Sequence, residues 1–144
     1  MDRPVNPVGN IRELASWRSY ITNLKERKAG ERIGYGGGKQ LLRDSVVATV
    51  GVGYGDGLNQ DLIRVGGPVL VGGKRCRLLS CCMDQCMVDV TDADCSVGDE
   101  VTFFGYDGRG NFLSSQEVAA LINGDEGCGL TSALSGRVER VYIS

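Results

Sequence analysis

Histidine is absent from the 144 residues of this sequence. A Ser-His-Asp triad or a Cys-His nucleophilic pair therefore cannot form within the chain. A zinc site would have to use thiolates alone, and the sequence has no pair of CxxC knuckles to supply them. Neither sign of charge dominates, because 16 basic residues face 18 acidic ones. The sequence thus gives no reason to expect binding to nucleic acid or to an anionic membrane.

Long apolar runs are also missing. None approaches the length of a membrane span, and residues 1–10 carry prolines and charges where a signal peptide would have a hydrophobic core. We therefore expect a cytoplasmic protein, or the cytoplasmic domain of a membrane-anchored one. Because nothing marks secretion, we expect the cysteines to be free and mostly buried thiols. They are Cys76, Cys81, Cys82, Cys86, Cys95 and Cys128.

Glycine is plentiful, at 22 residues, while proline is scarce, at 3. The glycines gather between short β-branched runs, a pattern typical of a small barrel or sandwich. The length suits one domain. Residues 17–24 have apolar side chains at helical spacing, but their aromatic and β-branched content favours a strand. The other predicted strands cover residues 46–52, 68–71, 87–91, 100–104 and 137–143.

Between these predicted strands the sequence carries signals for turns and for one helix. The pair Gly72-Gly73 predicts a two-residue hairpin, and residues 96–100 read as a tight turn before a strand. One helix is expected at about residues 115–123. Ser114 is a good N-cap for it, and Glu117 completes a capping box.

Two tyrosines stand between glycines. Tyr35 lies in Ile33-Gly34-Tyr35-Gly36-Gly37-Gly38, and Tyr54 follows a hydrophobic strand in Gly53-Tyr54-Gly55-Asp56-Gly57. Glycine lets the backbone come close to a ligand, and loops at strand ends often carry function. Taken singly, each motif is better explained by a structural role. Tyr35 would cap the barrel as a loop aromatic, and Asp56 would order its own turn.

A third motif, Cys82-Met83-Asp84-Gln85, lies between two strand-like runs. Met83 could be core filler. Asp84 and Gln85 are less ordinary in an apolar region, because partly buried polar groups need partners and often lie where the backbone is shaped for a ligand.

In their order along the chain, these motifs resemble those of the C-terminal domain of alanine racemases. Each motif alone is weak, but the ordered set is specific and covers roughly residue 15 to the end. The matching segments are Ile33-Gly34-Tyr35-Gly36, Gly53–Gly57, Val69–Arg75, Cys82–Gln85, Val97–Val101, Ser115–Ala120 and Arg137–Tyr142.

The resemblance implies an all-β fold: a small Greek-key β-barrel with one short helix over residues 15–144. Residues 1–14 would be a leader or the remnant of a preceding barrel domain. In such enzymes that preceding barrel holds pyridoxal 5'-phosphate on a lysine, and a homodimer builds each active site from one subunit's barrel and the other's β-domain. The implied function is racemisation of a small amino acid, with this chain inactive alone.

The resemblance also assigns residue roles. Tyr35 would give or take the α-proton on the face opposite the lysine, which suits a reaction that needs two opposed bases. A tyrosine has an ordinary pKa of about 10, so the partner barrel would have to supply cations around it. Tyr54 would lie near substrate and phosphate, Met83 would offer its backbone amide to the substrate, and Asp84 would shape that turn.

Two departures from the family pattern bear on specificity. Residues 58–60 replace the residues that usually follow the tyrosine-glycine motif. Cys128 falls near the place of a tyrosine that walls the substrate pocket, which predicts room for serine as well as alanine, as in serine/alanine racemases of vancomycin-resistance clusters. A non-catalytic β-barrel that dimerises or binds a partner is the main alternative, and a related pyridoxal-phosphate decarboxylase domain is a weaker one.

Overall fold

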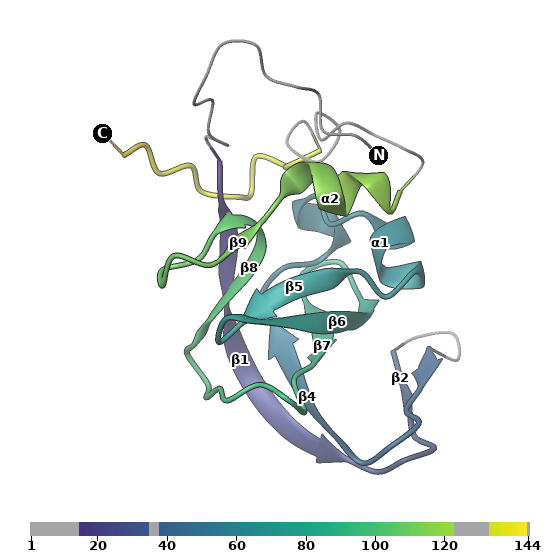
Figure 1. The fold of residues 1–144 in the computed structure, drawn as a ribbon. Helices are drawn as coiled ribbons and strands as arrows, with labels where there is room; N and C mark the ends of the chain where they lie inside the picture. The colour runs from purple at the N-terminus through teal and green to yellow at the C-terminus, as the bar shows by residue number, and fades with distance from the viewer. Residues whose placement is uncertain (1–14, 35–37, 123–132, 144) are drawn as a thin grey trace.

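The computed structural model describes residues 15–34, 38–122 and 133–143. In chain order its elements are β1 (Trp17–Arg27), β2 (Arg32–Ile33), β3 (Lys39–Gln40), β4 (Ser45–Val50), the 3-10 turn η2 (Tyr54–Asp56), α1 (Gln60–Arg64), β5 (Pro68–Val71), β6 (Lys74–Cys81), β7 (Cys86–Asp89), β8 (Glu100–Tyr106), β9 (Phe112–Leu113) and α2 (Ser115–Ala120). Strands dominate this part of the chain, as the sequence predicted (Figure 1).

The main sheet closes on itself through its longest strand. Strand β1 pairs with β4 along Ile21–Arg27 and with β8 along Trp17–Tyr20, antiparallel in both cases. The other pairings run β4-β7-β6-β5-β8, so the sheet returns to β1. Strand β9 pairs antiparallel with the end of β8, and β2 with β3 forms a separate hairpin (Figure 1). Strands β1, β4, β7, β6, β5 and β8 therefore form a closed ring of pairings, which is the topology of a barrel.

The strand order is that of a Greek key. Strands β5, β6 and β7 are consecutive neighbours, while β4 lies beside β7 and reaches β5 only through residues 51–67. Three hairpin-linked strands with a fourth returned to the first define this motif. The predicted Greek-key barrel is therefore confirmed, and its long connection carries the Tyr54 motif and α1.

The barrel interior is packed by β-branched and aromatic side chains. The Trp17 ring centroid lies 5.0 Å from that of Phe103 and 6.1 Å from that of Phe104, and such pairs add about 0.5–1.5 kcal/mol beyond burial. The buried pattern of β1 confirms the strand predicted for residues 17–24. Fully enclosed core residues from four strands are Val69, Val71, Leu78, Val88 and Val101.

Local turn chemistry agrees with the sequence in one hairpin. Strands β5 and β6 are joined by Gly72 and Gly73, with φ of 59° and 78° and Val71 opposite Lys74. Two successive positive φ values match the right-handed twist of the strands, which is why Gly-Gly serves there.

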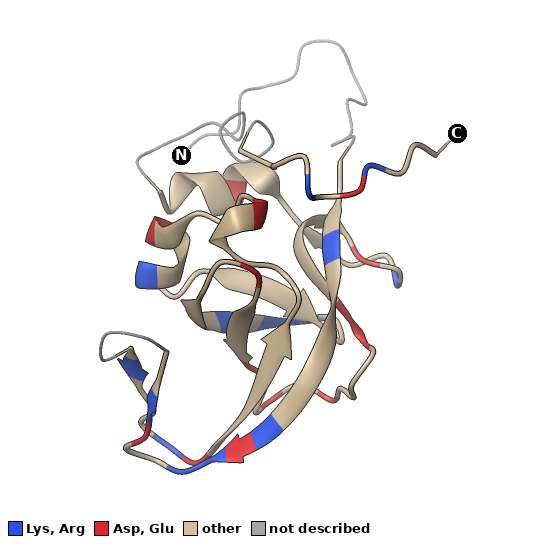
Figure 2. Ribbon diagram, turned by 180° about the vertical axis from the view of Figure 1, so that it is seen from behind, with Lys and Arg blue, Asp and Glu red and all other residues tan. Residues whose placement is uncertain are grey.

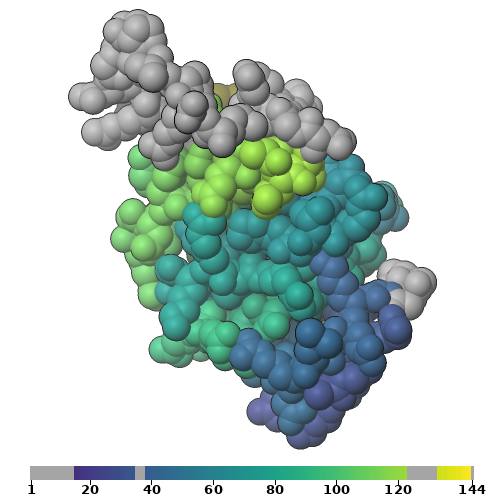
Figure 3. Space-filling view, turned by 45° about the vertical axis from the view of Figure 1, so that its right-hand side comes forward, coloured from purple at the N-terminus to yellow at the C-terminus, as the bar shows by residue number. Residues whose placement is uncertain are grey.

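The described residues contain two short helices, where one was predicted. Helix α1 was missed: its N-cap Asn59 accepts a hydrogen bond from Asp61 N at 2.7 Å, and it buries Leu62 and Ile63. Helix α2 covers one end of the barrel (Figures 1 and 3). Ser114 is its N-cap as predicted, but the Ser114 side chain makes no cap hydrogen bond, and the Glu117 carboxylate pairs with Arg75.

The strand predicted for residues 137–143 is wrong. This segment has no regular structure, and Val141, Tyr142 and Ile143 are 74%, 92% and 91% exposed. Alternating β-branched residues form a strand only against a partner. Within the described residues, the segment pairs with none of the strands.

Surface charge is mixed, as the near balance of acidic and basic residues suggested. Figure 2 shows Lys and Arg interspersed with Asp and Glu along the ribbon. Among the described residues, no helix is long and apolar enough to cross a membrane. The five described cysteines are free: Cys76 and Cys86 are buried, and Cys81, Cys82 and Cys95 are half-buried.

Candidate functional site

Two motifs that lie far apart in the sequence are held together by backbone hydrogen bonds. Tyr54 N donates to Cys82 O at 3.0 Å, and Gly55 N donates to Met83 O at 2.8 Å. Residues 53–57 follow β4, and residues 82–85 link β6 to β7. We refer to these two segments as the paired turns. The barrel positions them, because β4 and β6 both flank β7.

Glycine makes this close approach possible. A Cβ placed on Gly53 would lie 2.2 Å from Cys82 O, and one on Gly55 would lie 2.8 Å from Met83 O. Both distances are too short for any side chain. The glycines around Tyr54 therefore have a packing reason that is independent of any ligand.

Asp56 locks the first of the paired turns. The residue is 9% exposed. Its carboxylate accepts a hydrogen bond from Gly53 N at 2.9 Å and lies 3.5 Å from Arg137 Nε. Ser135 N also donates to Asp56 O at 3.0 Å. The predicted role of Asp56 in ordering its own turn is confirmed. The partnership with Arg137 was missed, because nothing in the local sequence links two residues so far apart.

Replacing Asp56 with alanine is expected to lower the free energy of unfolding by about 1–3 kcal/mol, because the buried Gly53 N–H would lose its acceptor. Urea unfolding of the folded chain measures this loss. Asp61→Ala is the matched control, since Asp61 pairs with Arg64 in an exposed i,i+3 ion pair, and its removal should cost less than about 1 kcal/mol. Equal losses for the two variants would contradict the assigned role of Asp56.

The paired turns present a backbone donor at the surface. Tyr54 N fixes the orientation of Cys82 O, and in a trans peptide the N–H points away from the C=O. Met83 N–H therefore points away from Tyr54 N, and no acceptor among the described residues takes its hydrogen bond. Tyr54 and Met83 are 47% and 56% exposed. The paired turns thus expose a phenol and a thioether, and among the described residues the Met83 amide has no hydrogen-bond acceptor.

Asp84 faces its own turn. Its Oδ1 lies 3.7 Å from Cys82 Sγ, which also lies 3.5 Å from Gln85 O, and Cys82 N donates to Gln85 O at 2.9 Å. These contacts close the four-residue turn that carries Met83.

Tyr35 and Cys128 lie outside the described residues. The described neighbours of Tyr35 are anchored to the barrel. A Cβ on Gly34 would lie 2.5 Å from Ser80 Cβ on β6. On the other side, Lys39 Nζ donates to Ile63 O and Leu78 O. Burial lowers the pKa of Lys39, and the charge of Arg77 adds to the effect.

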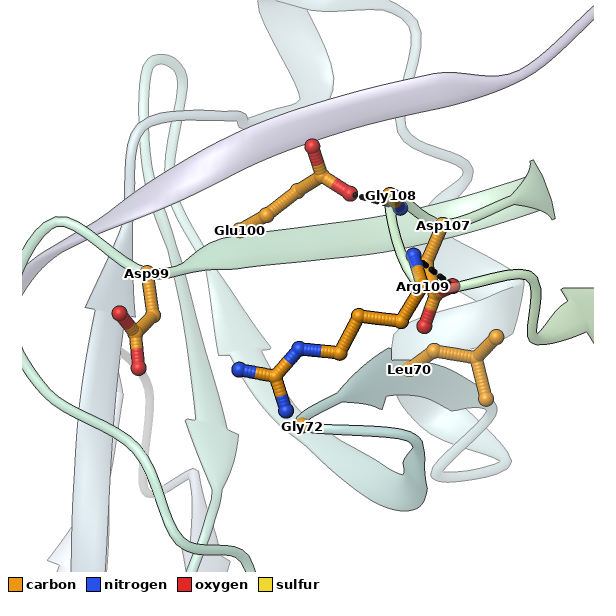
Figure 4. A pocket seen from close by; sticks show the side chains of 7 residues that line it. All are labelled: Leu70, Gly72, Asp99, Glu100, Asp107, Gly108 and Arg109. Atoms are coloured by element: carbon orange, nitrogen blue, oxygen red, sulfur yellow. Dashed lines mark hydrogen bonds between the residues drawn. The ribbon is translucent and has the colours of Figure 1, made fainter.

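A hollow of about 260 Å³ lies between the β5–β6 hairpin, the start of β8 and the loop after β8 (Figure 4). Its carboxylates are occupied by loop backbone: Asp99 accepts from Ser96 N, Glu100 from Gly108 N and Asp107 from Arg109 N. It is therefore best explained as a structural crevice. Within the described residues, no cluster of three or more His, Cys, Asp or Glu side chains could hold a metal ion.

Known proteins similar to this chain are alanine racemases. The model of the family "Alanine racemase, C-terminal domain" matches residues 14–142. The alanine racemase of Sorangium cellulosum is 42% identical over 139 residues, which cover 92% of this chain and 36% of that protein. That of Clostridium tetani is 33% identical over 136 residues, covering 93% of this chain and 35% of that protein. The chain thus spans about a third of the length of these relatives.

Solved structures agree with the sequence comparison. The alanine racemase from Oenococcus oeni superposes with a TM-score of 0.83 at 28% identity, over 97% of this chain and 38% of that one. The enzyme from Bacillus anthracis, crystallised with bound L-Ala-P, gives a TM-score of 0.80 at 30% identity, over 90% of this chain and 32% of that one. Family model, relatives and fold agree, and the chain belongs to the family of alanine racemase C-terminal domains.

Proposed function

We propose that this chain is the domain of a pyridoxal-phosphate-dependent racemase that completes the active site on a barrel domain of the partner subunit in a homodimer. The substrate would be alanine, with serine as a second candidate. The observation that carries this proposal lies in the paired turns, where Tyr54 and Met83 are exposed and Met83 N–H has no acceptor among the described residues. Membership of the family supports the reaction class.

The residues of this chain would bind the substrate and exchange its α-proton. Tyr35 would exchange a proton between its hydroxyl and the α-carbon of the substrate, on one face of the planar centre. Met83 N–H would donate to a substrate oxygen, and its direction is set in advance by the bond from Tyr54 N to Cys82 O. Asp84 would keep the turn closed. A prearranged donor of this kind needs no reorganisation during the reaction.

Pyridoxal phosphate, when bound, would supply the electron sink for the α-carbon. The described residues fit a peripheral role toward it. The Tyr54 side chain is half exposed on the paired turns, and its hydroxyl can donate to a phosphate oxygen. Lys39, in contrast, already donates to two carbonyls. As in the family that the chain resembles, the lysine that holds the cofactor would come from the barrel domain.

Complementation tests the proposal. The chain is mixed with a separately expressed racemase barrel domain that has been loaded with pyridoxal phosphate, and racemisation of L-alanine and of L-serine is followed by optical rotation. We expect racemisation of alanine only when both parts are present. Serine turnover would support the assignment of Cys128 to the pocket wall, because a side chain smaller than tyrosine leaves room for a hydroxymethyl group.

The outcomes separate the alternatives. Racemisation of alanine without any serine turnover would reject the role of Cys128 and leave the racemase assignment intact. Binding to the barrel without turnover, measured by sedimentation, would favour a non-catalytic dimerisation module. Decarboxylation of an amino acid by the mixture would favour the decarboxylase relatives.

A further inference from the structure

Two cysteines face each other across the base of the second paired turn. Cys81 ends β6, Cys86 begins β7, and the two residues are direct register partners in the antiparallel pair. The residues between them form the turn that carries Met83 and Asp84. The sequence places Cys81 and Cys86 five positions apart, and only the register shows that they are opposite one another.

The backbone hydrogen bonds show which of the two kinds of antiparallel pair Cys81 and Cys86 form. Cys82 N donates to Gln85 O, so the pair one step inside the turn is hydrogen-bonded. Antiparallel ladders alternate, and Cys81 with Cys86 is therefore a non-hydrogen-bonded pair, with Cα atoms about 4.5 Å apart and side chains on the same face. A disulfide accepts Cα separations of about 4.4–6.8 Å. This is the cross-strand position that a disulfide can bridge without movement of the backbone.

The neighbouring thiol of Cys82 does not point toward this pair. Successive strand residues alternate between faces, and Cys82 Sγ contacts Asp84 and Gln85 within its own turn. Cys86 is 1% exposed in the barrel core, and Cys81 packs against the same core. Burial chiefly raises the pKa of both thiols, while the nearby Tyr54 N–H opposes the rise for Cys81. Cys81 is therefore the accessible member of the pair.

We propose that Cys81 and Cys86 form an oxidisable dithiol, whose disulfide would join β6 to β7 beneath the paired turns. This inference rests on strand register and does not depend on the racemase assignment.

The chemistry needs a low-molecular-weight disulfide as oxidant. The thiolate of Cys81 attacks one sulfur of that disulfide, and one small thiolate leaves. The thiolate of Cys86 then attacks Cys81 Sγ in the mixed disulfide and displaces the second small thiolate. The two protons lost by the protein thiols end on the two released thiols. The protein pair is oxidised by two electrons, and the external disulfide is reduced by two.

Mass-spectrometric mapping of the full folded chain tests the pair. The chain is incubated with oxidised glutathione at neutral and at mildly alkaline pH, acid-quenched, unfolded and alkylated, and each cysteine is then read in the digest. We expect Cys81 and Cys86 to lose alkylation together and completely, Cys82 to keep it, and dithiothreitol to restore both. Oxidation should be faster at the higher pH, because raised pKa values leave little thiolate near neutrality.

Two variants test whether Cys81 and Cys86 are the residues that form the disulfide. In Cys82→Ser the loss at Cys81 and Cys86 should persist, while in Cys81→Val the alkylation of Cys86 should remain complete. A bond between Cys81 and Cys82, a lasting glutathione adduct, or full alkylation of both residues after exhaustive alkaline incubation would overturn the proposal. The wild-type map decides the matter even if a variant fails to fold.

Discussion

Replacing Tyr35 with phenylalanine is expected to lower alanine racemisation about 10²- to 10⁴-fold in an enzyme assembled from this chain and a cofactor-loaded barrel, the range typical for loss of a general acid or base. The change removes one hydroxyl and keeps the ring, so assembly with the barrel should persist. Steady-state rates in both directions measure the effect. The value of kcat/KM should fall by the same factor in both directions, because the ratio of the two values equals the equilibrium constant between the enantiomers, which no substitution changes.

Isotope exchange distinguishes a lost base from a damaged site. In deuterated water, the Tyr35→Phe enzyme should still exchange the α-hydrogen of the enantiomer served by the opposite base, without inverting it. Loss of exchange from both enantiomers would point instead to a general defect. Tyr20→Phe is the matched control, since Tyr20 is an exposed tyrosine on β1, outside the paired turns, and should leave the rates unchanged. A Tyr35→Phe enzyme as fast as this control would reject Tyr35 as the base.

Much of the barrel followed from local sequence rules. Gly72-Gly73 needs two positive φ values and is therefore legible as a hairpin without any tertiary information. The strand at residues 17–24 was recovered partly because aromatic and β-branched residues favour a pleated, half-buried surface, and partly from the family resemblance. Helix α1 escaped notice because five residues are too few to show a helical period, and its only signal is the N-cap Asn59.

The candidate site shows where sequence reasoning ends. The glycines near Tyr54 suggested close backbone approach, but the partner in that approach, the turn of Cys82 to Gln85, is a tertiary fact. The run that begins at Arg137 read as a strand, yet Arg137 instead pairs with Asp56. The order of the motifs along the chain gave the resemblance to a family, whereas the hydrogen bonds that align Met83 N–H could come only from coordinates.

Gly53→Ala is expected to destabilise the chain by about 2–3 kcal/mol, at the upper end of the cost of inserting a methyl group where there is no space. The backbone of Gly53 is extended, with φ of −135°, so alanine meets no conformational barrier there. The cost comes from the new Cβ, 2.2 Å from Cys82 O and 2.5 Å from Met83 C. Backbone atoms cannot rotate away as a side chain can, and the paired turns would have to separate. Thermal unfolding should show a midpoint lower by roughly 6–10 °C.

Gly51→Ala provides the same chemical change two residues earlier. A Cβ on Gly51 would meet Ser19 Oγ at 3.7 Å, an ordinary van der Waals contact, and its effect should stay within about 0.5 kcal/mol. The difference between the two variants therefore isolates the contact between the paired turns from the general effect of glycine on the unfolded chain. Equal midpoints would mean that the two turns can part at little cost. The alignment of Met83 N–H could then not be a fixed property of the fold, and the binding role proposed for that amide would fail with it.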